Sequence, residues 1–375
     1  MAPGRGALQM GDDLYDNPLG TDGFEFVEYT SREPQTLGRL FENMGFTAVA
    51  HHRSKHVLRY KQGDINFILN MEPAGQAADF RGVHGASINA MAFRVHDAAE
   101  ALRLAVQRGA RQVAGTIGPS ELNIPAIEGI GGSYLYLVDR YGAQGIYDID
   151  FKPIPAAAER EQANGAGLTY IDHLTHNVHR GQMQTWAEFY QRVFNFHQIR
   201  YFDIEGKLTG LLSRAMTSPD GAIRIPLNES QDEHSQIEEY LHDYHGEGIQ
   251  HVALGTANIY ESVDRMRARG VQFQDTPETY YEAVDARVAG HGEDLARMRA
   301  RRILIDGAPT QGQGLLLQIF TRPVIGPCFF EIIQRKGNEG FGEGNFKALF
   351  ESLELDQFRR GVLPGDQWNK AAGPT

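Results

Sequence analysis

Three side chains in the second half of the chain could together bind a metal ion: His173, His251 and Glu331. They stand out because the two halves of the chain resemble each other, and the matching positions in the first half hold Glu28, Ala90 and Tyr136. A ligand set that occurs in one of two related scaffolds indicates a single metal site. Two imidazoles and one carboxylate bind Fe(II) in non-haem oxygenases and leave coordination positions open. Zinc accepts the same ligand types, so the three residues alone leave the identity of the metal open.

His173, His176 and His179 form an H-x-x-H-x-x-H string that resembles a zinc motif. The surrounding segment reads as a β-strand, and on a strand the side chains three positions apart face opposite sides. We therefore expect His176 to be a packing or hydrogen-bonding residue and not a metal ligand.

The elements that must position these ligands are predicted from an internal repeat. INAMAFRVHDAAEALRLAVQRGA from Ile88 and IQHVALGTANIYESVDRMRARGV from Ile249 match at an offset of 161 residues. Each reads as an apolar strand followed by an amphipathic helix that ends at a glycine. The pattern predicts an α+β protein of four β-α-β-β-β units, paired into two half-open barrels whose concave faces form pockets.

A segment rich in alanine and proline, FKPIPAAAEREQANGAG, separates the two halves and shows no apolar period of a strand or helix. It sets the expected domain organisation. We predict an N-terminal barrel without metal ligands at 21–151, a linker at 152–167, a catalytic barrel with a C-terminal lid helix at 168–356, and a tail at 357–375.

Composition excludes several classes of function. The 375 residues carry 36 Lys and Arg against 48 Asp and Glu, a net charge of −12, which argues against a nucleic-acid-binding surface. No apolar stretch is long enough to span a membrane, and the first twenty residues lack the apolar core of a signal peptide. A single cysteine, Cys328, rules out an internal disulfide and suits a reducing compartment, so we expect a cytoplasmic protein.

Five segments carry a family resemblance: IDHLTHNV, EGIQHVAL, LLLQIFT, FFEIIQR and GFGEGNFKALFES. They resemble the 4-hydroxyphenylpyruvate dioxygenases of the vicinal oxygen chelate (glyoxalase-like) superfamily. The resemblance implies one Fe²⁺ per chain, held by His173, His251 and Glu331. It also implies that 4-hydroxyphenylpyruvate and O₂ are converted to homogentisate and CO₂ in tyrosine and phenylalanine catabolism, by a chain that forms a homo-oligomer (dimer or tetramer).

The same resemblance implies the residues that contact the substrate. They are Ser213, Asn228, Gln236, Gln250, Gln318, Phe329 and Phe346. Phe329 precedes Glu331 by two residues, so both side chains point to the same side of a strand. Gln250 adjoins His251 and would face away from it on an ideal strand, so a substrate contact from Gln250 requires a bulge or an indirect effect.

The C-terminal segment has apolar residues at helical spacing, Phe346, Leu349, Phe350 and Leu353, after a glycine-rich stretch. Two interpretations are open: a helix docked permanently on the core, or a lid hinged at the glycines. The resemblance favours a lid that includes Phe341, Asn345 and Phe350.

Two alternative functions remain. 4-Hydroxymandelate synthase uses the same fold, metal ligands and substrate but hydroxylates the benzylic carbon. A metal-free small-molecule-binding protein on the same scaffold is a rival from another class, although such a protein would not need the complete ligand set.

Overall fold

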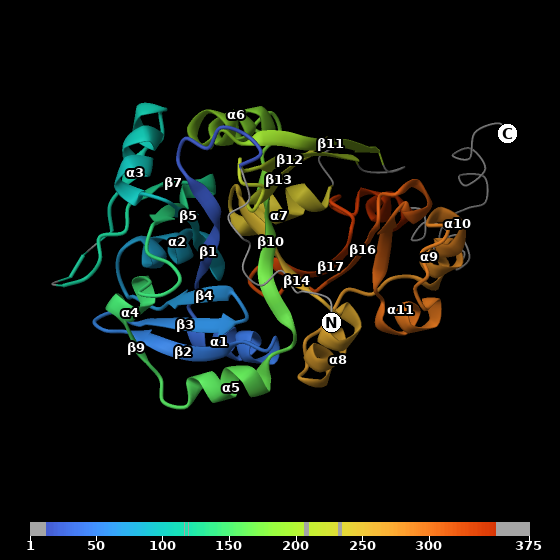
Figure 1. Cartoon of the computed structure of the whole chain (residues 1–375), viewed down its shortest axis with the longest axis horizontal. Helices are drawn as coiled ribbons and strands as arrows, with labels where there is room; N and C mark the ends of the chain where they lie inside the picture. The colour runs from blue at the N-terminus through green and yellow to red at the C-terminus, as the bar shows by residue number, and fades with distance from the viewer. Residues whose placement is uncertain (1–12, 116, 119, 206–209, 232–234, 350–375) are drawn as a thin grey trace.

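The computed structural model describes residues 13–115, 117–118, 120–205, 210–231 and 235–349. Two curved sheets lie side by side, the first drawn mainly in blue and teal and the second in green to red, and the long strand β10 belongs to the second sheet (Figure 1). The tail at 357–375 and Phe350 lie outside the described residues. No helix in the described part of the chain is long and apolar enough to cross a bilayer.

The elements of the first half run in this order: β1 (Thr21–Thr30), α1 (Pro34–Asn43), β2 (Thr47–His52), β3 (Val57–Gln62), β4 (Ile65–Asn70), α2 (Gln76–His84), β5 (Ser87–Val95), α3 (Ala98–Gln107), β6 (Gln112–Val113), β7 (Ala126–Glu128), β8 (Tyr134–Val138), α4 (Ile146–Asp150) and β9 (Phe151–Pro153). A short 3₁₀ turn, η1 (Ile130–Gly132), precedes β8. The segment predicted as a linker contains helix α5 (Ala157–Asn164), which leads into the second half.

The second half repeats the pattern with β10 (Leu168–Val178), α6 (Met183–Phe194), β11 (His197–Glu205), β12 (Gly210–Thr217), β13 (Arg224–Ser230), α7 (Gln236–Tyr244), β14 (Gly248–Thr256), α8 (Ile259–Ala268), α9 (Glu278–Glu282), α10 (Val284–Arg287), α11 (Leu295–Arg301), β15 (Leu304–Gly307), η2 (Pro309–Gln311), β16 (Leu315–Phe320) and β17 (Phe329–Lys336). Residues 343–349 add a further helical segment.

Both sheets have the same strand order, which confirms the predicted repeat. From one edge to the other, the first sheet runs β6-β7-β8-β5-β1-β4-β3-β2, with β9 added after β2. In the same direction the second sheet runs β15-β16-β17-β14-β10-β13-β12-β11. Strand β1 therefore corresponds to β10, β5 to β14 and β8 to β17. In each half the central strand pairs parallel to one neighbour and antiparallel to the other. The α+β architecture of two curled sheets is therefore the predicted one.

Local chemistry explains why the repeated helices begin and end at matching residues. Asp97 and Asn258, 161 positions apart, cap α3 and α8 by accepting a hydrogen bond from a backbone N–H three residues on. Gly109 and Gly270 follow the two helices with φ of +91° and +92°, a conformation that glycine adopts without steric cost.

Aromatic side chains join the two halves in one core. Tyr29 and Phe67 from the first sheet pack against Phe330 from the second, with ring centroids 6.2 and 5.7 Å from that of Phe330. All three side chains are fully buried. This packing joins β17 of the second sheet to β1 and β4 of the first.

The strand register corrects one equivalence that the sequence comparison predicted. His173 pairs with Ala253, which pairs with Glu331; in the first sheet the corresponding row is Phe26, Ala92 and Tyr136. The counterpart of His173 is therefore Phe26, and the predicted counterpart, Glu28, lies two residues further along the strand. The register shifts of β1 and β10 fall at matching positions, so bulges do not cause the difference. The comparison failed because a shift of two residues keeps every side chain on the same face of a strand, and the residue types of β1 and β10 do not distinguish the two alignments.

Candidate metal centre

The structure brings His173, His251 and Glu331 together from three adjacent strands, β10, β14 and β17. Their ligand atoms lie within 4.8 Å of one another, and all three residues are buried. Oε2 of Glu331 lies 3.2 Å from Nε2 of His173 and 3.4 Å from Nε2 of His251. The three side chains share one face of the sheet, because His173 and Glu331 both pair with Ala253 and His251 lies two residues before Ala253 on β14.

Neighbouring side chains orient both imidazoles. Nδ1 of His173 lies 2.8 Å from Oδ1 of Asp172, and Nδ1 of His251 lies 3.0 Å from Oε1 of Gln250. An acceptor on Nδ1 favours the tautomer that carries its proton there and leaves Nε2 free to bind a cation. In both residues, Nε2 is the nitrogen that faces Glu331.

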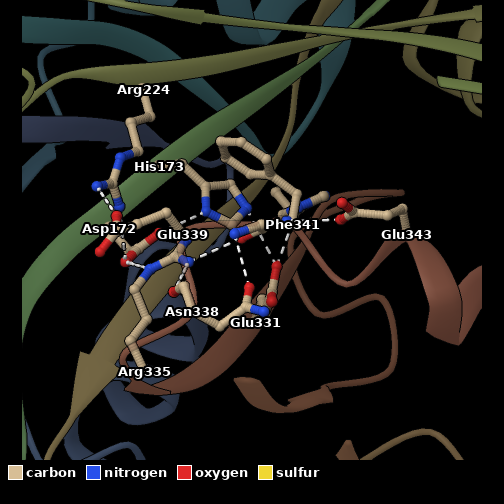
Figure 2. A network of polar contacts seen from close by, with 11 residues as sticks. Asp172, His173, Arg224, Glu331, Arg335, Asn338, Glu339, Phe341 and Glu343 are labelled. Carbon is tan, nitrogen blue, oxygen red and sulfur yellow. Dashed lines mark hydrogen bonds and ion pairs between the residues drawn. The ribbon is translucent and has the colours of Figure 1, made fainter. Parts of the chain in front are cut away.

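A second layer of charge surrounds Asp172. Arg335 donates to both of its carboxylate oxygens, and Arg224 approaches at 3.7 Å (Figure 2). Burial opposes ionisation of Asp172, but the charge and hydrogen bonds of Arg335, with the bond to His173, hold its pKa well below the ordinary value. The carboxylate is therefore charged at neutral pH and fixes the ring of His173.

The carboxylate of Glu331 is the third member of the centre. Burial disfavours its charged form, but the interactions with His173 and His251 lower its pKa below the ordinary value. Oε1 of Glu331 is buried and has no hydrogen-bond partner within the described residues. A buried carboxylate oxygen without a partner is costly unless a cation binds it.

These observations fit a divalent metal ion at this point. Two imidazole nitrogens and a carboxylate oxygen point toward the same position, and Asp172 and Gln250 contact the opposite nitrogen of each ring. This is the ligand set of non-haem Fe(II) oxygenases. Burial also lowers the pKa of His251, which favours the neutral, metal-binding form of that ring.

A cavity of about 210 Å³ adjoins the centre and is lined by His251. Five of the seven residues predicted to contact substrate line it: Asn228, Gln236, Gln250, Phe329 and Phe346. The ring of Phe329 stacks on that of His251, with centroids 4.8 Å apart, so one wall of the cavity continues directly into the metal centre. Gln250 reaches the cavity although it adjoins His251, because β10 and β14 are bulged beside it.

Ser213 and Gln318 are not among the residues that line this cavity. Ser213 lies on β12, paired with Asn228, and is nearly buried. Gln318 is buried on β16, on the face shared with Glu331, and a side chain added at Gly342 would collide with its amide. Gln318 therefore lies beneath the glycine-rich segment, where its Oε1 has no partner among the described residues.

The segment predicted as a lid lies over the centre. The ring of Phe341 meets that of His173 edge-on, with centroids 5.3 Å apart, and Phe346 and Leu349 reach the cavity. Asn345 points elsewhere: its Oδ1 accepts hydrogen bonds from Tyr280 and Arg287 and anchors the helical segment.

Sequence reasoning missed several residues of the site. Asp172 and Arg335 carried a signal that could have revealed them, since each is a charged residue on the same strand as a predicted metal ligand, His173 or Glu331. Gln274, Arg302 and Phe320 also line the cavity. Phe320 belongs to the segment LLLQIFT, which carried part of the family resemblance. No sequence signal marks Gln274 or Arg302, because they come from segments that only the fold brings to the cavity.

Known proteins match the chain over most of its length. A family model described as "Hydroxyphenylpyruvate dioxygenase, HPPD, N-terminal" matches residues 15–152, and one described as "Glyoxalase/Bleomycin resistance protein/Dioxygenase superfamily" matches residues 170–284. The chain is 61% identical to 4-hydroxyphenylpyruvate dioxygenase of Pseudomonas aeruginosa, over 92% of this chain and 97% of that protein. The chain belongs to the 4-hydroxyphenylpyruvate dioxygenase family.

Two further relatives extend the comparison. Hemolysin VllY of Vibrio vulnificus is 63% identical over 92% of this chain and 98% of its own length. The solved structure of a variant of 4-hydroxymandelate synthase from Streptomyces coelicolor has 26% sequence identity and a TM-score of 0.76, and the match covers 90% of this chain and 99% of that one. The 4-hydroxyphenylpyruvate dioxygenase family thus shares its fold with 4-hydroxymandelate synthase.

Proposed function

We propose that the chain is an Fe(II)-dependent dioxygenase that converts 4-hydroxyphenylpyruvate and O₂ to homogentisate and CO₂. The observation that carries the proposal is the convergence of His173, His251 and Glu331 beside a cavity that both aromatic and amide side chains line. His173, His251 and Glu331 would hold ferrous iron, which the 2-oxo acid could chelate and which would supply the redox chemistry that O₂ activation needs. The oxygen balance closes without a second 2-oxo acid, because both atoms of O₂ enter the two products.

The protein's own residues would prepare the substrate. Phe329 and Phe346 offer apolar faces for the aromatic ring, and Asn228, Gln236 and Gln250 offer hydrogen bonds for its polar ends. Asp172 and Gln250 hold the two imidazoles with Nε2 toward the metal position. Phe341 and the segment 343–349 would exclude water from the centre as a lid, with Asn345 as its anchor.

The decisive experiment is product analysis after anaerobic loading with Fe(II). We expect one Fe(II) per chain, and homogentisate with CO₂ as products when 4-hydroxyphenylpyruvate and O₂ are added. A chain that binds no iron would support a metal-free binding protein instead.

4-Hydroxymandelate synthase remains the second candidate, because a solved variant of that enzyme shares the fold over 90% of this chain. The same chromatogram separates the two, since 4-hydroxymandelate as the main product would overturn ring hydroxylation. A cytoplasmic location and a dimeric or tetrameric assembly stay predictions, which cell fractionation and light scattering would test.

A further inference from the structure

The N-terminal barrel has a cavity of its own, of about 140 Å³, where the second barrel holds its site. Strand register shows the correspondence: Asn70 matches Asn228 and Val57 matches Ser213, because each pair occupies the same place in its sheet. Both Asn70 and Val57 line the N-terminal cavity. The first barrel therefore keeps a concave pocket, although it lacks the metal ligands.

The metal position of the second barrel is filled by aromatic rings in the first. Phe26 and Tyr136 occupy the places of His173 and Glu331, and their ring centroids are 5.7 Å apart. Both rings line the cavity, together with Ile68 and Ile124. Aromatic side chains therefore line the first cavity at the positions where the second barrel has two of its metal ligands.

One buried carboxylate lines this cavity. Oε1 of Glu28 accepts hydrogen bonds from Asn70 at 2.9 Å and from Asn89 at 2.6 Å. Within the described residues, no hydrogen bond reaches Oε2. Burial raises the pKa of Glu28, although the hydrogen bonds from Asn89 and Asn70 and the charge of Lys55 lower it in part.

The charge of the lining favours a cation as ligand. Glu28, Glu121 and Asp150 line the cavity against a single lysine, Lys55, whose Nζ pairs with Glu121 at 2.8 Å. The volume suits one six-membered ring, since an engineered apolar cavity of ~150 Å³ binds benzene.

We propose that the N-terminal barrel binds a small aromatic amine, with its ring against Phe26 and Ile68 and its ammonium group on Oε2 of Glu28. This site is separate from the metal centre and takes a different class of ligand. It gives the metal-free barrel a binding function in addition to its structural one.

The test is calorimetric titration of the iron-loaded protein with benzylamine. We expect one molecule bound per chain, with an affinity that saturating 4-hydroxyphenylpyruvate, added without O₂, leaves unchanged. Benzyl alcohol, which has the same ring and no charge, should bind at least about tenfold more weakly. Absence of binding, equal binding of the two probes, or displacement by 4-hydroxyphenylpyruvate would overturn the proposal.

Glu28→Gln tests the carboxylate directly. Glutamine keeps the shape and an acceptor for Asn70 and Asn89 but places an N–H donor where Oε2 stood, so benzylamine affinity should fall at least about tenfold. Glu159→Gln on the exposed face of α5 makes the same change in net charge and should leave the affinity unchanged. Unchanged affinity in Glu28→Gln contradicts the site. If that variant does not fold, Ile124→Trp fills the cavity instead, and retained binding there would overturn the proposal.

Discussion

Arg335 binds both carboxylate oxygens of Asp172, with Nε–Oδ2 and Nη2–Oδ1 distances of 2.7 and 2.8 Å. The same guanidinium donates through Nη1 to the backbone carbonyls of Asn338 and Gly340, at the start of the glycine-rich segment. One side chain on β17 thus links the residue that orients His173 to the segment that covers it (Figure 2). Arg335 therefore stabilises both the metal centre and the glycine-rich segment that lies over it.

Arg335→Lys should weaken Fe(II) binding about 10–100-fold, because lysine keeps the charge but cannot bind both oxygens of Asp172 in one plane. Anaerobic Fe(II) titration measures the change. Arg224→Lys is the matched control, since Arg224 approaches Asp172 only at 3.7 Å and should change the affinity little. Wild-type iron affinity in Arg335→Lys would show that the two-oxygen contact does not position His173.

Glu331→Ala should lower turnover at least about a thousandfold, since loss of the metal removes several kcal/mol of charge stabilisation. The protein should remain folded, because the substitution also removes a buried carboxylate oxygen that has no partner among the described residues. Oxygen uptake and far-UV circular dichroism check both parts. In the wild type, excess Fe(II) should raise Tm, and in Glu331→Ala it should not. Substantial oxygen uptake by Glu331→Ala would contradict the metal assignment.

Gly342→Ala tests the fit between the glycine-rich segment and the sheet beneath it. Gly342 has a φ of +78°, and a Cβ there would lie 1.9 Å from Oε1 of Gln318. We expect a lower kcat/KM and a loss of about 2–4 kcal/mol in unfolding free energy, from backbone strain and overpacking together. Gly312→Ala shares the strain, with φ of +76°, but meets nothing within 4 Å. It should cost only about 1–2 kcal/mol and spare kcat/KM. Equal effects of the two substitutions would exclude the contact with Gln318 as the cause.

His176 should make stability depend on pH. Its Nε2 lies 2.7 Å from the hydroxyl of Tyr190, and burial lowers its pKa from 6.5 to about 3. Below pH 6.5 the unfolded chain therefore binds a proton that the folded chain does not, so the free energy of unfolding falls as pH falls, by up to about 1.4 kcal/mol per pH unit. This contribution to the slope ends below pH 3, where both states are protonated.

Urea unfolding between pH 6.5 and 4.5 measures that slope in the wild type and in His176→Gln, which cannot titrate. We expect a shallower pH dependence in the variant. Identical slopes would mean that other groups account for the loss of stability.

The extent of prediction from sequence differs between the fold and the site. The repeat at an offset of 161 predicted matching helices because capping residues and terminal glycines act locally, and α3 and α8 do correspond. Comparison of the halves also matched His251 with Ala90 and Glu331 with Tyr136, and the strand register confirms both matches. It misplaced the counterpart of His173 by two residues, because a shift of two keeps every side chain on the same face of a strand and so leaves the apolar pattern almost unchanged.

Residue types and spacing by themselves determined the class of fold, the three candidate ligands and the family to compare. Only the tertiary structure decided that Gln250 reaches the cavity, that Ser213 and Gln318 do not line it, that Arg335 supports Asp172, and that the first barrel keeps a pocket around Glu28. The reason is physical: capping, periodicity and motif spacing depend on neighbours along the chain, whereas pockets and charge networks depend on strands that the fold brings together from distant parts of the sequence.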